Sequence, residues 1–296
     1  MPLPVDTTPF TEPDSVNLLQ RIQAHPVPTT LRGAPISTTF VHWPCPSPQD
    51  APPFLLIHGF DSSVVEFRRL MPLLARHRDV WAIDLLSFGF TERPQDVPYT
   101  AASLNAHLYA AWKTLIGQPV VIVGASMGGA AALDLALTHP EVATSLVLLD
   151  SAGPARGPNL SRFLPPGVGQ LAAEVLRNPQ VRQRISRQAY CDPSFASADA
   201  ARCAALHLAC PNWRRALAAF TRSGGYNVLT RQQIAQVNQP TLLVWGENDA
   251  ILGTALAAQL RDLIPNSELR WVERCGHVPH LEQPKATAEL ITAWMK

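Results

Sequence analysis

A serine flanked by glycines lies where a catalytic nucleophile could act. Gly124-Ala-Ser126-Met-Gly128 follows the apolar run 120–123 and precedes a segment of helical length. A nucleophilic serine needs a tight strand-to-helix turn that holds its Oγ above the sheet. Such a turn brings the backbone close two residues before and two residues after the serine, which favours glycine at both positions. The alternative is an ordinary glycine-rich turn. A nucleotide-binding loop is disfavoured, because neither a GxGxxG nor a GxxxxGK[ST] motif is present.

A serine nucleophile requires a general base and an acid that orients the base. Of nine histidines, His277 is the candidate base, since it follows the last expected strand in a glycine-containing loop, and His280 is the alternative. Asp249 follows the penultimate expected strand and is the candidate acid, with Asp150 and Glu247 as alternatives. All these residues lie beyond the carboxyl ends of parallel strands, where open α/β sheets place their sites.

Two backbone amides are candidates for stabilising an oxyanion. His58-Gly-Phe60 follows an expected strand, and Gly59 lets the chain turn so that the Phe60 N–H points into the pocket. Together with the Met127 N–H, at the start of a helix, it would form a two-donor oxyanion hole. His58 itself is expected to be a buried structural histidine, and the loop 84–93 a structural or pocket-wall segment.

Short apolar runs alternate with segments of helical length and must supply the scaffold for these residues. Continuous rather than alternating hydrophobicity indicates strands that are buried on both faces, and the order of the elements predicts an α/β fold with a mostly parallel sheet flanked by helices. Segment 36–43 is expected to be an extra edge strand and 14–24 a short leading helix. Strands are expected at 54–57, 80–85, 120–123, 145–149, 241–245 and 268–272, and helices near 63–76, 101–116, 127–138, 253–263 and 284–295.

The interval 154–235 interrupts this alternation, because it contains helical stretches and no convincing strand. It is predicted to be an inserted helical cap on a core formed by 1–153 and 236–296. The cap stretches are expected at 168–177, 179–189, 197–209 and 212–223. The interval holds eleven Arg against three acids, a net charge of +8, whereas the rest of the chain carries 13 basic and 20 acidic residues. This asymmetry distinguishes the cap from the core.

Composition excludes several classes of protein. The chain has 296 residues, of which 47% are hydrophobic and 16% charged, so it can bury a core and is not disordered. A net charge of +1 removes the usual argument for nucleic-acid binding. Five cysteines without a CxxC pair predict neither a disulfide framework nor a zinc site, and favour a reducing compartment. We expect no metal and no cofactor.

Neither a signal peptide nor an 18-residue apolar stretch is recognisable. The sequence therefore predicts a soluble protein that is cytoplasmic, or peripheral on the inner face of an internal membrane.

His58-Gly-Phe60, Gly124-Ala-Ser126-Met-Gly128, Asp249 and Gly276-His277, in this order, resemble the α/β-hydrolase family with a helical cap. The resemblance covers about 36–296. Within the family, Leu56-Ile-His-Gly-Phe-Asp-Ser-Ser63, Glu66-Phe-Arg68 and Trp81-Ala-Ile-Asp-Leu-Leu-Ser-Phe-Gly-Phe90 are similar to chlorophyll dephytylases, which hydrolyse the phytyl ester of chlorophyll. Ser87 departs from the wider family, where glycine is common.

These observations predict a cofactor-independent serine hydrolase of carboxylic esters that acts through an acyl-enzyme, with phytol removal from chlorophyll-type pigments as the finer expectation. Ser126 would attack the carbonyl, His277 would transfer the proton to the leaving alcohol, and Asp249 would hold the imidazole. A C–C bond hydrolase, a perhydrolase and a proline-type aminopeptidase could use the same triad. A binding module on a hydrolase scaffold is the non-enzymatic alternative.

The expected partner is a hydrophobic ester. A phytyl ester would need a long apolar slot, for which the cap offers Phe163-Leu-Pro-Pro166, Val168, Leu171 and Val175-Leu176, although each could instead form the core of the cap. The basic cap could also hold the protein against an anionic membrane surface. A solvated Arg-rich face is the alternative.

Overall fold

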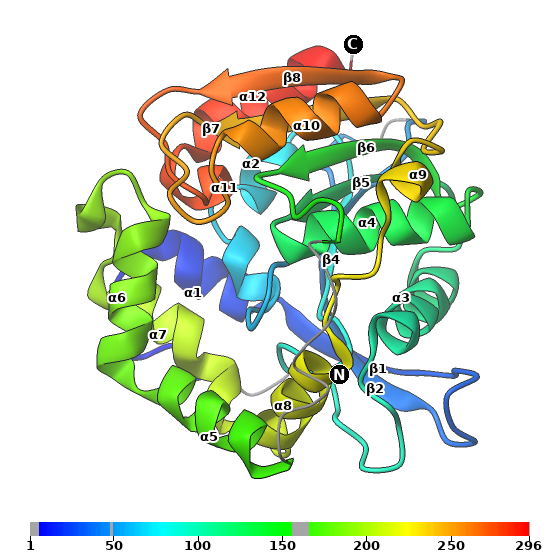
Figure 1. Ribbon diagram of the computed structural model, residues 1–296. Helices are drawn as coiled ribbons and strands as arrows, with labels where there is room; N and C mark the ends of the chain where they lie inside the picture. The colour runs from blue at the N-terminus through cyan, green and yellow to red at the C-terminus, as the bar shows by residue number, and fades with distance from the viewer. Residues whose placement is uncertain (1–5, 48–49, 156–165, 296) are drawn as a thin grey trace.

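The computed structural model describes residues 6–47, 50–155 and 166–295. Its centre is an eight-stranded sheet in the order β1-β2-β4-β3-β5-β6-β7-β8 (Figure 1). β2 pairs antiparallel with β1 and β4, and every other neighbouring pair is parallel, which confirms the predicted fold class. The strands are β1 (Ile22–Val27), β2 (Ile36–Trp43), β3 (Phe54–Ile57), β4 (Val80–Ile83), β5 (Val120–Ala125), β6 (Ala143–Leu149), β7 (Thr241–Gly246) and β8 (Ser267–Val272).

Helices cover both faces of the sheet, which is why its central strands are continuously apolar. In β3, Leu55 and Ile57 belong to the core on one face, whereas Phe54 and Leu56 belong to the core on the other. The first face packs against α3 (Ala101–Leu115), α4 (Met127–Thr138) and α10 (Ala255–Leu263). The second packs against α1 (Pro13–Leu19), the 3₁₀ helix η1 (Val64–Phe67), α2 (Met71–Leu74) and α12 (Pro284–Trp294).

A group of helices connects β6 to β7; α5 to α8 form the layer at the lower left of Figure 1, whereas α9 lies at the right of the view, near α4. Gly169 of α5 lies against Ala218 of α8, where an added Cβ would be 3.4 Å from the alanine Cβ, so these two helices pack closely. The group contains α5 (Pro166–Arg177), α6 (Pro179–Ala189), η3 (Pro193–Phe195), α7 (Ala198–Ala205), η4 (Leu206–Ala209), α8 (Trp213–Ser223) and α9 (Arg231–Ile234). None of the helices in the described ranges has the length and apolarity that a membrane span would need.

The structure corrects four expectations about individual elements. The leading helix ends at Leu19, and Ile22–Val27 forms an additional strand that pairs with β2, so 36–43 is not an edge strand. Only the two ends of that strand are buried, and Pro26 interrupts it, so its sequence lacks a strand pattern. The expected helix 63–76 is divided into η1 and α2, and α2 begins with Pro72 in its first turn. The expected helix 197–209 is likewise divided into α7 and η4.

Ser87, the departure from the family pattern, has a backbone conformation that suits glycine. Its φ is 85°, its side chain is fully buried, and its Oγ has no hydrogen-bond partner among the described residues. A side chain in this region strains the backbone, and an unpaired buried hydroxyl adds a desolvation cost.

Replacing Ser87 by glycine is therefore expected to raise the free energy of unfolding by about 1 kcal/mol. Urea unfolding followed by circular dichroism measures the change. The matched control is Ser145→Gly in β6, which lacks a positive φ and should be destabilised by about 0.5–1 kcal/mol. A Ser87→Gly protein that is no more stable than wild type would contradict this account of strain.

Candidate active site

Ser126 lies at the turn between β5 and α4 in a strained conformation, with φ 53° and ψ −119°. A Cβ added to Gly124 would lie 2.5 Å from the Gly128 carbonyl oxygen, and one added to Gly128 would lie 2.1 Å from the Ile57 carbonyl oxygen. Both contacts are too short for any side chain. The two glycines are therefore required by the close approach of β3, β5 and α4, as the sequence pattern predicts.

The structure brings together the three side chains that the sequence analysis selected. The Ser126 Oγ is 2.9 Å from the His277 Nε2, and the His277 Nδ1 is 3.0 Å from the Asp249 Oδ2. The other oxygen of Asp249 accepts hydrogen bonds from the amides of Ile251 and Leu252, at 2.8 and 3.1 Å. This is the geometry in which an imidazole can accept the serine proton while its second nitrogen donates to a carboxylate.

The candidate acid Asp249 and its two alternatives, Asp150 and Glu247, occupy different environments. Burial acts to raise the pKa of Asp249, but hydrogen bonding and charge interaction with His277 lower it overall, which keeps this carboxylate ionised. Burial, with repulsion from Asp249, raises the pKa of Asp150 well above its ordinary value. Asp150 accepts from the amide of Gly246 at 3.1 Å, and Glu247 is exposed. Among the three candidates, Asp249 alone is hydrogen-bonded to His277 in the described structure.

Asp150, Asp249 and His277 also place possible metal-ligating atoms within 4.8 Å of one another. The Asp249 and His277 atoms are already engaged with each other, and Asp150 bonds to the β7 backbone. The donor set is therefore accounted for by hydrogen bonds inside the protein.

The amides predicted to stabilise an oxyanion lie beside Ser126. Phe60 lines the cavity that contains Ser126, and Met127 follows Ser126 directly and lines a second cavity together with Phe60. Among the described residues, neither the Phe60 N–H nor the Met127 N–H has a hydrogen-bond acceptor. The preceding Gly59 amide donates to the Glu66 Oε2 at 3.1 Å, which fixes the loop that presents Phe60. Two free N–H groups next to a nucleophile can stabilise a developing negative charge on a carbonyl oxygen.

Two histidines contribute to this loop without touching Ser126. His58 is fully buried, its Nδ1 donates to the Gly59 carbonyl at 2.8 Å, and its Nε2 accepts from the Leu85 amide at 3.2 Å. Burial lowers the pKa of His58 to about 4, so it is neutral, in agreement with the structural role predicted for it. The His280 Nε2 lies 2.9 Å from a carboxylate oxygen of Glu66. Although burial opposes ionisation, His280 and His58 lower the pKa of Glu66 to about 2.

The loop that carries His277 is attached to the helices between β6 and β7. The His277 amide donates to the carbonyl of Ala189, at the end of α6, at 2.7 Å. The buried carboxylate of Glu282, in α11 (Pro279–Glu282), accepts from the amides of Gly276 and Cys191 at 2.7 and 3.0 Å. The position of the imidazole therefore depends on α6 as well as on the sheet.

A second attachment joins the oxyanion loop to the same helices. Asp61, next to Phe60, accepts from Arg182 of α6 at 2.7 Å, from His207 at 3.1 Å and from the Trp213 indole at 2.8 Å. We call these four side chains, Asp61, Arg182, His207 and Trp213, the Asp61 cluster. Burial opposes ionisation of Asp61, but His207 and Arg182 lower its pKa overall. A charged group of the core is thus held by three helical segments of the cap.

The Asp61→Asn variant is expected to lose about 3 kcal/mol in its free energy of unfolding, because the Arg182 charge remains buried without its partner. The double variant Asp61→Asn/Arg182→Met should lose less than the sum of the two single losses, since it removes both charges. Urea unfolding of the three proteins measures the difference. Additive losses would show that the two groups do not interact.

The cavity that contains Ser126 and His277 has a volume of about 420 Å³ and lies between the core and the cap. Its wall includes Leu176, Ile185 and Tyr190 from the helices and Val65 from the core. Of the apolar residues predicted to form a slot, Leu176 lines this cavity, whereas Leu171 and Val175 are exposed. Residues 163–165 and the side chain of Val168 lie outside the described part of the chain.

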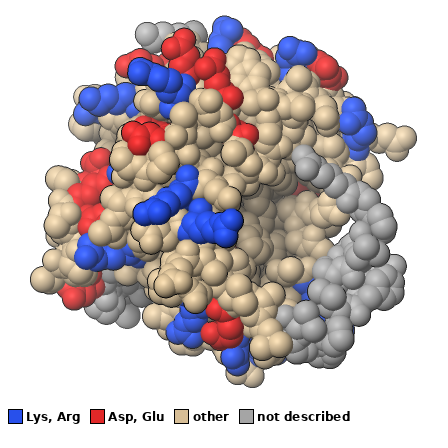
Figure 2. Space-filling view, turned by 60° about the vertical axis from the view of Figure 1, so that its left-hand side comes forward, with Lys and Arg blue, Asp and Glu red and all other residues tan. Residues whose placement is uncertain are grey.

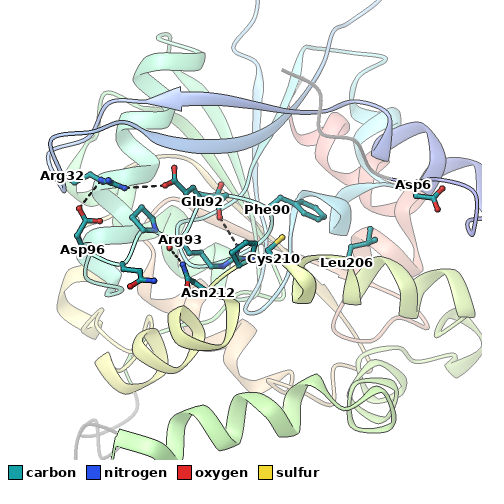
Figure 3. Close-up of a pocket in the computed structure, with 13 residues that line it drawn as sticks. Asp6, Arg32, Phe90, Glu92, Arg93, Asp96, Leu206, Cys210 and Asn212 are labelled. Carbon is teal, nitrogen blue, oxygen red and sulfur yellow. Dashed lines mark hydrogen bonds and ion pairs between the residues drawn. The ribbon is translucent and has the colours of Figure 1, made fainter.

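A larger cavity, of about 870 Å³, lies between the 90–96 loop and the segment 206–212 (Figure 3). Among its charged side chains, Arg32 lies 3.6 Å from Glu92 and 3.4 Å from Asp96. Asn212 points toward the loop and donates to the Arg93 carbonyl at 3.0 Å. None of its described lining residues also lines the Ser126 cavity. This second cavity is therefore a separate crevice at the boundary between the cap and the core.

No role is predicted from the sequence for Asp61, Glu66 or Glu282, although all three hold parts of the site. Glu66 and Asp61 lie within the short stretches that resemble a known branch, but their partners are far away in the sequence. A buried carboxylate close to a catalytic motif is the signal that could have indicated them.

The comparisons with known proteins agree with this geometry. A family model described as the alpha/beta hydrolase fold matches residues 52–284. The alpha/beta hydrolase domain-containing protein VTE7 of Arabidopsis thaliana is 35% identical over 295 residues, covering 98% of this chain and 88% of that protein. A 2-hydroxy-6-oxo-2,4-heptadienoate hydrolase of Pseudomonas putida is 30% identical over 251 residues, covering 82% of this chain and 88% of that protein.

Solved structures show the same architecture. A thermophilic esterase from Thermogutta terrifontis superimposes with a TM-score of 0.76 at 22% identity, covering 92% of this chain and 98% of the esterase. At this identity the likeness concerns the fold.

Proposed function

The chain belongs to the alpha/beta hydrolase family, and within it we propose that the protein is a serine hydrolase of apolar carboxylic esters. The observation that carries the proposal is the unbroken hydrogen-bonded series from Ser126 through His277 to Asp249 at the wall of a cavity. The family recognised from the sequence is confirmed. Hydrolysis is the general activity of this family, and specificity for esters is what we propose for this protein.

In the proposed reaction, the Ser126 Oγ attacks the ester carbonyl carbon while the His277 Nε2 takes its proton. The Phe60 and Met127 amides donate to the resulting oxyanion. His277 then gives the proton to the leaving alcohol, which leaves an acyl group on Ser126. Water repeats the sequence: His277 takes a proton from it, the acid is released, and Ser126 is regenerated. Asp249 stabilises the imidazolium that forms in both halves.

The lining of the cavity favours an uncharged substrate. Of the three arginines that line it, the buried Arg68 is paired with Glu12 and the partly buried Arg182 with Asp61, whereas Arg177 is exposed to solvent. A dienoate such as the substrate named for the Pseudomonas putida relative carries a carboxylate that needs a cationic partner. C–C bond hydrolysis of that class of substrate is therefore the second candidate, supported by the relative and disfavoured by these ion pairs.

The finer proposal is a phytyl ester. It rests on the resemblance of Leu56–Ser63 and Trp81–Phe90 to chlorophyll dephytylases and on the apolar residues of the cavity wall. Burial of a long alkyl chain against such a wall contributes about 0.8 kcal/mol for each CH₂ group, which would select long alcohols over short ones.

A substrate panel tests the proposal. A short chromogenic ester, chlorophyll a and a 2-hydroxy-6-oxo-dienoate are offered separately to the wild-type protein. We expect turnover of the short ester and release of phytol from chlorophyll a, with little cleavage of the dienoate. Turnover of the short ester alone would refute the phytyl assignment. Turnover of the dienoate alone would replace ester hydrolysis by C–C bond hydrolysis.

A further inference from the structure

Exposed apolar side chains gather around the mouth of the Ser126 cavity. Phe60, Ile185 and Ile251 are each more than 40% exposed, and all three also line the cavity. Two more exposed residues, Leu171 and Val175, belong to α5, whose last two residues, Leu176 and Arg177, line the cavity. Isolated apolar residues on a surface need no explanation, whereas a group around one opening indicates an interaction surface.

Arginines accompany these residues on α5 and α6. Arg177 lies at the cavity wall, and Arg184 and Arg187 are close to Ile185 in the sequence of α6. All three are exposed, and none has an ion-pair partner among the described residues. By contrast, Glu174, the one acid between residues 166 and 189, is paired with Arg214. The two helices therefore present positive charge that the described part of the protein leaves unmatched.

Figure 2 shows the molecule turned so that the left-hand side of Figure 1, where α6 and α7 lie, comes forward. This side is hollowed, and Lys and Arg side chains lie beside the hollow, with Asp and Glu side chains elsewhere on the same side. We call Leu171, Val175, Arg177, Arg184, Ile185 and Arg187 the α5–α6 face.

We propose that the α5–α6 face docks on an anionic lipid bilayer, with the cavity mouth toward the membrane. Apolar side chains among arginines have the composition of a peripheral membrane surface: the former enter the acyl boundary and the latter pair with anionic headgroups. The arrangement gives an ester with a long alkyl chain a path from the bilayer to Ser126 without passing through water. This part of the inference rests on the proposed function, whereas the docking itself does not.

Vesicle flotation tests the proposal with the whole 296-residue chain. Wild-type protein is mixed with vesicles of phosphatidylcholine alone, or of phosphatidylcholine with 30% phosphatidylglycerol, in about 50 mM and about 500 mM NaCl. We expect strong binding to the anionic vesicles at low salt, weaker binding at high salt, and weak binding to phosphatidylcholine. Equal binding to both vesicle types, or none to either, would overturn the proposal.

Two variants localise the contact. Arg184→Gln/Arg187→Gln is expected to lower the partition coefficient about 25-fold, because each arginine near an anionic surface contributes roughly a factor of five. The matched control, Arg261→Gln/Lys285→Gln, removes two exposed charges from α10 and α12 of the core and should bind within about threefold of wild type. An equal loss in the control would show that net charge, and not this face, causes binding.

Leu171→Ser/Val175→Ser is expected to lower binding about tenfold at both salt concentrations, since burial of apolar surface is insensitive to screening. Trp271→Ser, which changes an exposed aromatic residue of β8, is the matched control. If wild type is instead a dimer that this double variant disperses, the face belongs to a second copy and the proposal fails.

The outcome can be separated from that of the proposed function. Ser126→Ala should bind vesicles like wild type, and the surface variants should keep wild-type turnover of a short soluble ester. Vesicle binding without any ester turnover would refute the hydrolase proposal only. Ester turnover without vesicle binding would refute only the docking proposal.

Discussion

Replacing Ser126 by alanine is expected to lower kcat/KM for a short soluble ester by a factor of about 10⁴ to 10⁶. The variant lacks the Ser126 Oγ, which lies 2.9 Å from the His277 Nε2. Without this oxygen no acyl-enzyme can form. The residual rate would come from the oxyanion donors and from substrate binding. Steady-state kinetics with a chromogenic ester measure the loss.

Mass spectrometry supplies an independent readout for the same change. A fluorophosphonate should add one covalent label to wild type and none to Ser126→Ala. The matched control is Ser145→Ala in β6, which is 6% exposed and whose Oγ lies 3.9 Å from the Met295 sulfur, away from the triad. Turnover that survives in Ser126→Ala would falsify the acyl-enzyme mechanism.

The Asp249→Asn variant is expected to lose about 10⁴-fold in kcat with little change in fold. An amide can still bond to the His277 Nδ1, but it stabilises the wrong tautomer and no longer compensates the imidazolium charge. Asp150→Asn should change kcat less than about threefold, because burial and repulsion from Asp249 raise the pKa of Asp150 and so favour its neutral form, which an amide resembles in shape.

Comparing the two asparagine variants decides between the acids that the sequence left open. Glu247→Gln, at an exposed position, serves as the reference for a harmless loss of charge. A large loss in Asp150→Asn with a small one in Asp249→Asn would reverse the assignment. Similar large losses in both would indicate that the two carboxyls, which lie within 4.8 Å of each other, act together.

The parallel part of the fold could be predicted because its strands are buried on both faces. Val120–Val123 and Leu242–Val244 are fully buried, and such runs admit few other structures. β1 could not be predicted, since an edge strand with exposed residues at its centre has no comparable pattern. For the expected helix 63–76, Pro72 is the signal in the sequence against a continuous helix: proline suits the first turn of a helix, which is where Pro72 lies in α2.

The candidate site likewise contains residues that a local sequence motif identifies and residues whose partners are far away in the sequence. Ser126 and its glycines form a local motif, and the strand order explains why Asp249 and His277 lie near it. The Asp61 cluster joins residue 61 to residues 182, 207 and 213, and no local pattern records such partners. The acid was selected from strand position alone, whereas its hydrogen bond to His277 is a matter of side-chain geometry.

The placement of the cap between two neighbouring strands has a consequence for synthesis. Leu146 of β6 is paired with Thr241 of β7, although the entire helical insertion lies between them in the sequence. A ribosome therefore completes the serine turn long before the strand that precedes Asp249 leaves the exit tunnel, and His277 follows later still. During translation, the nascent chain therefore contains Ser126 before it contains His277, the base that would activate it. Competence for chemistry is thus acquired at the end of synthesis, when the last two strands add to the sheet.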